Sequence, residues 1–501
     1  MKNILELLER SASLYPQKTA FVDECDKVDY KQLVMSAKSI ASRITKNRKT
    51  NAPIAIFINK SIKCITAMLA VLYSGNFYVV IDTEIPKERI KSICQTLNPI
   101  LTIANHNQDL FPEDVCKCID YDELLKTELC EKELADIRKK MIDTDPAYAL
   151  FTSGSTGVPK GAIVSHRSVL SYAQWVTETF NISEKTVFGN QTPLYFSMSV
   201  TDVFSTIQNA ATLVLLPKSY FSFPAKLMET LKKYKVNTLY WVPSALGLVA
   251  NWKALDYIKL DSIETVMFAG EVMPVKYLNY WKAHFPNALF ANLFGPTEVT
   301  DICTYYIVNR DFSNDQSIPI GNACNNCGIV VIKDDDSEAL NGEEGELFVR
   351  GSFLANGYYN NAEKTKEAFV QNPLNSLYPE TVYRTGDIVR YNQYGELEYV
   401  GRKDFQIKHM GYRIELGEIE TAAYAIEGVS SVCCVFNQSS DEIILVYSGQ
   451  NVESEIVSDL IKKKLPRYME PSKVIKVSSM PQNANGKVDR PFIRKNYLSL
   501  S

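Results

Sequence analysis

The sequence has few of the features that mark several large classes of protein. It holds only four histidines among 501 residues, and its formal net charge of −4 leaves no broad positive surface for nucleic acid or an anionic membrane. Its longest apolar stretch, around Ala67–Leu72 and Phe77–Ile81, is interrupted by polar residues and falls short of the roughly 20 apolar residues that a membrane span needs. Glu6 and Glu9 interrupt any signal-peptide core. We therefore expect a cytoplasmic protein with no nucleic-acid or membrane partner.

The cysteines also lack the arrangement of a disulfide framework or of a complete metal site. There are 11 of them, an odd number, and they are scattered along the chain, which is typical of a reducing compartment. Cys324 and Cys327 have the spacing of half a zinc site, but neither a second cysteine pair nor a histidine pair stands nearby. We interpret them as two ordinary cysteines beside a strand.

The first 300 residues alternate between apolar, β-rich runs and longer helical patterns. A chain of 501 residues is too long for one core, so two to four domains are expected. Strands that alternate with helices indicate an α/β fold with mostly parallel, helix-covered sheets. The expected strands are Ile54–Ile58, Phe77–Ile81, Ile100–Ile103, Thr212–Leu216, Thr238–Val242 and Val266–Phe268.

The strand and helix pattern of the sequence changes twice in the rest of the chain. Between about residues 318 and 400 the pattern becomes short strands separated by glycine and asparagine, which predicts a small, β-barrel-like subdomain. After Gly401-Arg402-Lys403-Asp404, a last stretch has its own strand and helix patterns, and we expect it to form a smaller α+β domain. The predicted division is an N-terminal domain at residues 1–403 and a mobile C-terminal domain at 404–501. Its expected elements are Gly417–Ile426, Ser431–Phe436, Ile443–Tyr447 and Ser454–Lys464.

The segment Thr152–Gly161 is the first motif that carries chemistry. It packs three glycines, four hydroxyls and Lys160 into ten residues, directly after the apolar run Tyr148–Phe151. Glycines let the backbone approach a polyphosphate, while N–H groups, hydroxyls and one lysine provide its donors. The Gly-x-x-x-x-Gly-Lys-Ser/Thr pattern of the large NTPase class is absent, so this is a different kind of phosphate loop.

Together with five later motifs, this loop resembles the adenylate-forming superfamily. The motifs occur in the family's order over nearly the whole chain, and the last two are most similar to D-alanine–carrier-protein ligases and to adenylation domains of nonribosomal peptide synthetases. The five are Phe294-Gly295-Pro296-Thr297-Glu298, Tyr383-Arg384-Thr385-Gly386-Asp387, Gly401–Lys408, Gly411-Tyr412-Arg413-Ile414-Glu415 and Asn485-Gly486-Lys487-Val488-Asp489-Arg490.

The resemblance implies a site for ATP and Mg²⁺. Asp387 would accept both ribose hydroxyls, Arg402 would contact the ribose or the adenylate, and Asn292 with Phe294 would frame the adenine. Gly270 and Glu271 would lie at its edge. The phosphates would meet Lys160 and the hydroxyl-rich loop residues Thr152, Ser153, Gly154, Ser155 and Thr156.

The resemblance also assigns the chemistry to three residues. A carboxylate that attacks the α-phosphorus of ATP must overcome repulsion between anions. Glu298 would hold Mg²⁺, which neutralises the phosphates, and Thr297 would donate to the α-phosphate. Lys487 would bridge the substrate carboxylate and the α-phosphate and stabilise the transition state.

The second half-reaction needs a different arrangement of the same chain. Once the adenylate has formed, Lys487 must leave so that a thiol can enter, and the family achieves this by rotating the C-terminal domain. Asp404 occupies the hinge position, and Gly411 would line the path of a phosphopantetheine arm, where a side chain would obstruct it.

One position of the acyl pocket departs from the family pattern. Amino-acid-activating relatives usually place an aspartate in a Phe-Asp-x-Ser segment, where it pairs with the substrate's α-ammonium. Here Ser197 takes that place, and a hydroxyl cannot replace the charge. Asp202 is expected to be structural, whereas Asp301 is expected at the far end of the pocket. The pocket residues implied by the resemblance are Ser197, Met198, Thr201, Ser244, Met267, Ala269, Leu293, Asp301 and Ile302.

Several substrates and acceptors remain open at this level. Met198 and Met267 would narrow the pocket, favouring a small or slender acyl group. Three substrates fit: an amino acid whose amine lies away from the α-carbon and pairs with Asp301, a hydroxy, keto or aryl acid, or a small amino acid in a shifted pose. Alternatively, Asp301 points at solvent and decides nothing.

No Gly-Gly-x-Ser carrier site is present, so the expected acceptor is the phosphopantetheine thiol of a separate carrier protein. The sequence thus predicts an ATP-dependent ligase that activates a small carboxylic acid, with an amino acid as the first interpretation. The alternatives are an acyl-CoA ligase and a catalytically silent binding protein of the same fold.

Overall fold

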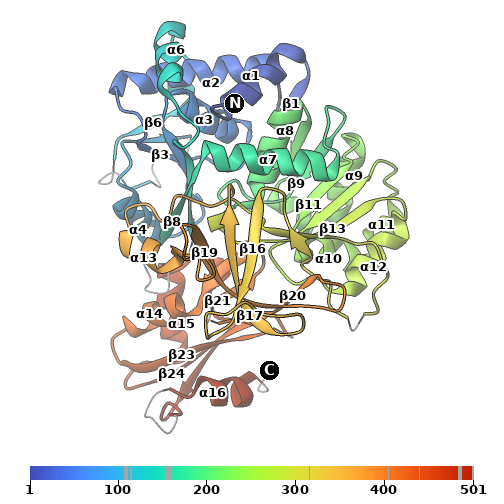
Figure 1. Ribbon diagram of the computed structural model, residues 1–501. Helices are drawn as coiled ribbons and strands as arrows, with labels where there is room; N and C mark the ends of the chain where they lie inside the picture. The colour runs from blue at the N-terminus through green and yellow to red at the C-terminus, as the bar shows by residue number, and fades with distance from the viewer. Residues whose placement is uncertain are drawn as a thin grey trace.

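The computed structural model describes residues 1–105, 111–112, 116–152, 159–314, 316–403, 406–438, 440–482 and 488–498. In Figure 1 the large N-terminal part of the chain, drawn blue to yellow, lies above the C-terminal part, drawn orange to red. Within these ranges, no helix is both long and apolar enough to cross a membrane.

The largest sheet has nine strands in the order β15-β14-β13-β12-β11-β9-β10-β1-β2. Its central strands, from β1 through β10, β9, β11 and β12 to β13, pair in parallel, and antiparallel strands stand only at its two edges. The bounds are β1 (Thr19–Val22), β2 (Lys27–Asp29), β9 (Val187–Asn190), β10 (Thr212–Leu215), β11 (Thr238–Trp241), β12 (Thr265–Phe268), β13 (Leu289–Phe294), β14 (Thr304–Ile307) and β15 (Asn322–Ala323).

A second sheet has six strands in the order β6-β5-β3-β4-β7-β8. It is parallel except for β7 and β8, whose antiparallel pairing sets Thr152 opposite Lys160. The bounds are β3 (Pro53–Phe57), β4 (Phe77–Val80), β5 (Leu101–Ala104), β6 (Cys118–Asp120), β7 (Pro146–Thr152) and β8 (Lys160–Ser165).

Helices cover these sheets, as the alternating pattern predicts. Helix α8 is buried along nearly its whole length because it packs against α1 and α7 and beside β9 and β10. The helices are α1 (Leu5–Leu14), α2 (Tyr30–Ile44), α3 (Ile62–Tyr73), α4 (Lys87–Leu97), α5 (Tyr121–Leu125), α6 (Glu131–Lys140), α7 (His166–Phe180), α8 (Met198–Asn209), α9 (Pro224–Lys233), α10 (Pro243–Asn251), α11 (Ala254–Tyr257) and α12 (Val275–His284), with the 3₁₀ helices η1 (Thr45–Asn47), η3 (Lys218–Ser222) and η4 (Thr297–Val299).

A five-stranded antiparallel sheet follows, where the sequence predicts the barrel-like unit. Its long strand β19 pairs with β17, β18 and β20, and β17 also pairs with β16. The bounds are β16 (Cys327–Ile332), β17 (Glu344–Gly351), α13 (Ala362–Ala368), β18 (Phe369–Gln371), β19 (Thr381–Tyr391) and β20 (Leu397–Arg402).

The C-terminal part, residues 406–498, begins with the hairpin β21–β22 and continues with the three-stranded sheet β23-β24-β25. Side chains alternate along β23: Val432 and Cys434 pack in one apolar cluster with α14 and α15, while Cys433 and Val435 pack in another with Ile493 of α16. The bounds are β21 (Gln406–His409), β22 (Tyr412–Glu415), α14 (Leu416–Tyr424), β23 (Val429–Asn437), β24 (Glu442–Gly449), α15 (Ser454–Lys464), η5 (Arg467–Met469), β25 (Lys473–Val477) and α16 (Arg490–Tyr497).

The predicted fold class is therefore confirmed: the chain has helix-covered, mostly parallel sheets, a small antiparallel sheet and an α+β C-terminal part. Each expected strand of the first 300 residues coincides with an observed one to within one or two residues.

Candidate active site

The predicted adenine residues lie where the parallel strands β11, β12 and β13 end. Trp241, Phe268 and Asn292 are paired across these strands, so the residues that follow them meet at one edge of the sheet. Ligands of open α/β sheets bind beyond the carboxyl ends of the strands. Asn292 is buried there, and its Nδ2 donates to the carbonyl of Pro319 at 2.9 Å.

Glu271 connects this edge to the C-terminal part of the chain. Its carboxylate accepts hydrogen bonds from the backbone N–H of Ser244 at 2.8 Å and from the Ser244 hydroxyl at 3.1 Å. It also accepts from the backbone N–H of Gly411. Burial raises the pKa of Glu271, and these donors oppose the increase. Ser244, predicted as a pocket residue, is exposed, and its hydroxyl donates to Glu271.

Glu298 and Asp301 belong to one tight loop after β13. The chain folds back so closely that a Cβ on Gly295 would lie 2.4 Å from the Asp301 carbonyl oxygen, which explains the glycine of this motif. Thr297 opens the 3₁₀ helix η4 and is partly exposed, while Glu298 beside it is fully buried. The loop therefore connects the predicted phosphate site to the predicted acyl pocket.

The Glu298 carboxylate has a partner on each oxygen. The Arg413 guanidinium donates to Oε2 at 2.5 Å, and the Tyr358 hydroxyl donates to Oε1 at 2.6 Å. Burial alone would raise the pKa of Glu298, but Arg413 and Tyr358 outweigh it and hold the pKa below its usual value. The carboxylate is therefore charged and compensated by a cation from the C-terminal part.

Lys160 begins β8 and meets the same hairpin. Its Nζ lies 3.7 Å from Glu415 Oε1 and 5.7 Å from the centre of the Tyr358 ring. The hairpin β21–β22 thus brings a cation to Glu298 and an anion to Lys160. Gln406 joins the two charges, because its amide donates to Glu415 at 2.6 Å while its oxygen accepts from Arg413 at 2.6 Å.

Asp387 and Arg402 face each other across β19 and β20. The Arg402 guanidinium donates to Asp387 Oδ1 at 2.8 Å, and both side chains are nearly inaccessible to solvent. Lys408 of β21 lies beside them, with its Nζ 4.3 Å from the centre of the Phe294 ring. Burial lowers the pKa of Lys408, and the nearby Asp387 carboxylate opposes this. The structure thus brings Phe294, Asp387 and Arg402 together, as predicted.

Gly411 forms the turn between β21 and β22 with a φ of +79°, a conformation that side chains disfavour. A Cβ at this position would lie 2.8 Å from Cγ1 of Val242, the residue after β11. The predicted entry glycine is therefore packed against the edge of the sheet, with no space for a side chain.

Among the predicted pocket residues, Ser197 and Thr201 donate hydrogen bonds to Asp301. Five others are buried and apolar, and a Cβ on Gly270 would lie 3.7 Å from the sulfur of Met198. Asp301 is 2% exposed, so the alternative in which it points at solvent is wrong. The apolar members are Met198, Met267, Ala269, Leu293 and Ile302.

Asp202 has its own protein partners, and it also interacts electrostatically with Asp301. Its Oδ2 accepts from the amide of Asn190 at 2.6 Å, and Lys60 interacts with it electrostatically. Burial raises the pKa of Asp202 to about 8. These partners are protein groups, which agrees with the expectation that Asp202 is structural.

Several predicted residues lie outside the described ranges: Ser153, Gly154, Ser155, Thr156, Asp404 and Lys487. Conversely, sequence reasoning gave no role to Tyr172, Tyr240, Tyr358, Lys408 or Arg413. Lys408 and Arg413 stand inside the quoted motifs, so a signal for them existed. The tyrosines stand in an ordinary helix, strand and loop and have no such signal.

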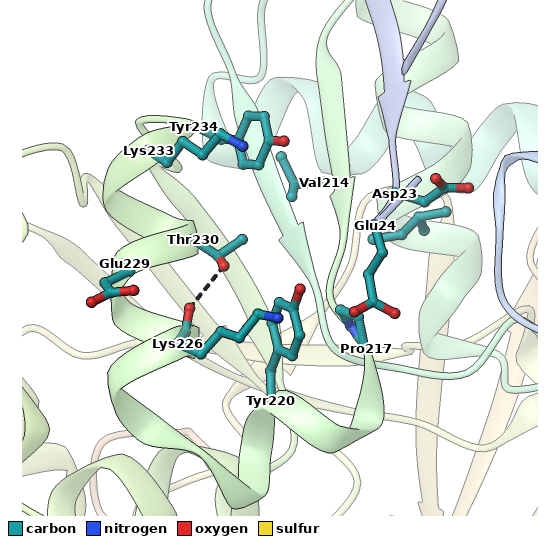
Figure 2. Close-up of a pocket in the computed structure, with 11 residues that line it drawn as sticks. Asp23, Glu24, Val214, Pro217, Tyr220, Lys226, Glu229, Thr230, Lys233 and Tyr234 are labelled. Atoms are coloured by element: carbon teal, nitrogen blue, oxygen red, sulfur yellow. Dashed lines mark hydrogen bonds between the residues drawn. The ribbon is translucent and has the colours of Figure 1, made fainter. Parts of the chain in front are cut away.

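A surface groove of about 260 Å³ lies elsewhere, between the end of β1, η3 and α9 (Figure 2). Its charges are mixed: Asp23 and Glu24 follow β1, while Lys226, Glu229 and Lys233 belong to α9, and the Lys226 ammonium lies 4.7 Å from the centre of the Tyr220 ring. None of the predicted site residues lines this groove.

Comparison with known proteins identifies the class. The model of the family described as AMP-binding enzyme matches residues 8–359. A D-alanine–D-alanyl carrier protein ligase of Bacillus licheniformis is 31% identical over 504 residues, covering 98% of this chain and 99% of that protein. Tyrocidine synthase 1 of Brevibacillus parabrevis is 30% identical over 494 residues, which are 98% of this chain but 44% of that protein, so the chain spans less than half of that relative.

Solved structures share the fold. The adenylation domain AlmE of Vibrio cholerae, in complex with glycyl-adenosine-5′-phosphate, superposes with a TM-score of 0.82 at 21% identity, covering 100% of this chain and 98% of that one. An o-succinylbenzoate CoA synthetase of Bacillus subtilis gives 0.85 at 19% identity, covering 99% and 98%.

The chain belongs to the AMP-binding enzyme family. It is an ATP-dependent ligase that forms acyl adenylates, of the type that comprises carrier-protein ligases and adenylation domains of nonribosomal peptide synthetases. The resemblance drawn from the motifs is thereby confirmed.

Proposed function

We propose that this ligase activates a small carboxylic acid as an acyl-AMP and then transfers the acyl group to the phosphopantetheine thiol of a separate carrier protein. The observation that carries the proposal is the position of the hairpin β21–β22, which places Arg413 on Glu298, Glu415 near Lys160 and Gly411 against Val242. Relatives named as carrier-protein ligases that match this chain end to end support the choice of acceptor.

In the first half-reaction, the substrate carboxylate attacks the α-phosphorus of ATP and pyrophosphate leaves. Lys160 offsets the charge of the phosphates, and Thr297 donates to the α-phosphate. Asp387 accepts the ribose hydroxyls, and Lys487 bridges the two reacting anions. Lys160, Thr297 and Lys487 act on charge that is present or develops at the phosphates, where preorganised donors lower the barrier most, whereas Asp387 positions the nucleotide.

Glu298 suits Mg²⁺, because this ion is usually held by one or two carboxylates together with substrate phosphates. Its carboxylate is buried and charged, and in the described arrangement Arg413 supplies the positive charge that a bound metal ion would supply in its place. Bound there, Mg²⁺ would neutralise phosphate charge and act as a Lewis acid.

We propose that the described arrangement serves the second half-reaction. The hairpin occupies both residues that phosphates and Mg²⁺ would use, so it fits a site from which pyrophosphate has left. Further contacts hold the C-terminal part there: Arg89 of α4 pairs with Glu418 of α14, both buried, and the Tyr412 ring packs edge-on against Phe196 at 4.8 Å.

The other arrangement requires the C-terminal part to turn. Residues 404–501 would move as one domain about Asp404 and bring Lys487 to the phosphates. At present Val488, the neighbour of Lys487, packs near Met480 and Ile493 on the α16 side of β23–β24. In Figure 1, α16 lies at the bottom of the molecule, on the side away from the large sheet.

The choice of acceptor can be tested by competition. Wild-type enzyme is given ATP, Mg²⁺ and an acid that supports adenylation, together with equal concentrations of CoA and a phosphopantetheinylated carrier protein. We expect acyl-carrier to form with AMP and pyrophosphate as the other products, as read by intact-protein mass. Acyl-CoA in place of acyl-carrier would contradict the proposal and favour the acyl-CoA ligase alternative.

Arg413→Gln is expected to impair transfer selectively. Without the guanidinium, Glu298 stays buried and unpaired in the transfer arrangement, and removing one partner of a buried ion pair costs about 3–5 kcal/mol. We expect acyl transfer to fall by at least ~10-fold, while exchange of pyrophosphate with ATP stays within about threefold of wild type.

The matched control is Arg310→Gln, which breaks the pair of Arg310 with Glu396, two hydrogen bonds of 2.8 and 2.6 Å remote from the hairpin. This variant should leave both half-reactions intact. An equal loss of exchange and transfer in Arg413→Gln would show that Arg413 does not act in the second half-reaction alone.

A further inference from the structure

The Asp301 carboxylate is surrounded by hydroxyl groups. It accepts from Ser197 at 2.9 Å, Tyr240 at 2.9 Å, Tyr172 at 3.0 Å and Thr201 at 3.0 Å. Tyr172, Thr201 and Tyr240 are fully buried, and they come from α7, α8 and β11. Three separate elements thus converge on one acid at the floor of the acyl pocket.

This acid lacks a positive partner among the described residues, because none of their cationic side chains forms an ion pair with Asp301 within 4.0 Å. The buried Asp202 interacts electrostatically with Asp301 and brings no positive charge, and its own cationic neighbour is Lys60. A buried charge is costly unless it is paired, and neutral hydroxyls compensate for only part of that cost. Burial raises the pKa of Asp301, and the surrounding hydroxyls oppose the increase, so this acid lacks a compensating cation among the described residues.

The two oxygens of Asp301 are unequally used. Oδ2 lies within 3.0 Å of the hydroxyls of Tyr172, Thr201 and Tyr240, whereas Oδ1 accepts from Ser197 alone. The Tyr172 and Thr201 hydroxyls also share a hydrogen bond of 2.7 Å, so one of these two can donate to the other while the remaining two fill Oδ2. An ionised carboxylate offers about two acceptor positions on each oxygen. Ser197 is partly exposed, so Oδ1 is the oxygen on the open side of the pocket and has capacity for one more donor.

We propose that Asp301 binds an ammonium group of the substrate, and that this ammonium is carried on the β- or γ-carbon of a slender acid. The inference rests on the proposed function, because it concerns the acid that the enzyme adenylates. An ammonium supplies both the missing charge and the donor for Oδ1. Ser197 donates its hydrogen bond inward, to Asp301. Asp301 therefore lies deeper than position 197, where amino-acid-activating relatives carry the aspartate that pairs with an α-ammonium.

The resemblance places apolar side chains around the acyl group of this substrate. Met198, Met267, Leu293 and Ile302 are all at most 7% exposed. Such surroundings suit a slender chain of two or three methylene groups whose terminal ammonium binds the Asp301 carboxylate. A hydroxy, keto or aryl acid would leave the buried charge without a partner.

The test compares matched acids in the exchange of labelled pyrophosphate with ATP. The probes are β-alanine and γ-aminobutyrate, set against L- and D-alanine, propionate and 3-hydroxypropionate. We expect β-alanine or γ-aminobutyrate to exceed every α-amino and amine-free acid at least ~10-fold in kcat/KM. In Asp301→Asn the preferred amino acid should lose about 30-fold or more, mainly through KM, while propionate changes little.

A second variant guards against simple misfolding. Ser197→Asp combined with Asp301→Ser moves the acid to the position nearer the reacting carboxylate, and we expect the preference to shift from the distal amine to alanine. Thermal unfolding of each variant reports whether the fold survives. If alanine or propionate serves as well as the distal amines and Asp301→Asn changes nothing, the inference is overturned and the proposed function stands. If none of the acids supports exchange, both are overturned.

Discussion

Gly411→Leu should abolish acyl transfer while adenylate formation continues. The Cβ would lie 2.8 Å from Val242 Cγ1, and the φ of +79° strains any side chain, so the hairpin must withdraw from the sheet edge. Displacements of about 1 Å in an active site can cost ~100-fold in rate. We expect transfer to a carrier protein to fall by at least that factor, and pyrophosphate exchange to stay within about threefold, because the hairpin leaves in the adenylation arrangement.

The matched control is Gly395→Leu. Gly395 has a φ of +72°, but no heavy atom of the described residues lies within 4 Å of where its Cβ would stand. This variant carries the same backbone strain without the clash and should keep both half-reactions. If Gly395→Leu lost transfer as Gly411→Leu does, strain alone would explain the effect. Loss of exchange in Gly411→Leu would contradict a role confined to thiol entry.

Glu298→Gln should abolish adenylate formation. The neutral amide cannot hold Mg²⁺, whose charge stabilisation amounts to several kcal/mol, so pyrophosphate exchange should fall ~100-fold or more at saturating Mg²⁺. Transfer from a supplied adenylate should fall too, because Arg413 loses its anion. Exchange at increasing Mg²⁺ concentrations, and transfer from the pre-formed adenylate, measure the two effects separately.

Glu396→Gln provides the comparison for this variant. Glu396 is also a buried acid paired with an arginine, Arg310, but it lies outside the site. It should lose stability without losing either half-reaction. Exchange by Glu298→Gln at the wild-type rate would remove Glu298 from the first half-reaction.

Much of the fold could be predicted because its signals are local. The runs Ile54–Ile58 and Thr238–Val242 are short, apolar and separated by helical patterns, and each coincides with a strand of a parallel sheet. The change after residue 318 to short strands separated by glycine and asparagine likewise marks the antiparallel sheet. Periodicity and turn residues determine such elements within a few residues of sequence.

The site could be predicted only where the residues stand in motifs. Asp387 and Arg402 lie together as expected, because the motif order carries that information. The hydroxyl cage of Asp301 could not be predicted, because Tyr172 and Tyr240 reach it from elements 129 and 61 residues away. The contact of Ser244 with Glu271 could not be predicted either, because it joins the first turn of α10 to a loop that follows a different strand.

The central claim, two half-reactions on one carboxylic acid, can be tested by a two-stage mass measurement. Enzyme, ATP, Mg²⁺ and β-alanine are first mixed without an acceptor, and the bound product is identified. A phosphopantetheinylated carrier protein is then added. The account predicts β-alanyl-AMP in the first stage and its replacement by AMP and a β-alanyl carrier in the second. An ADP product, or an adenylate that the carrier does not discharge, would contradict it.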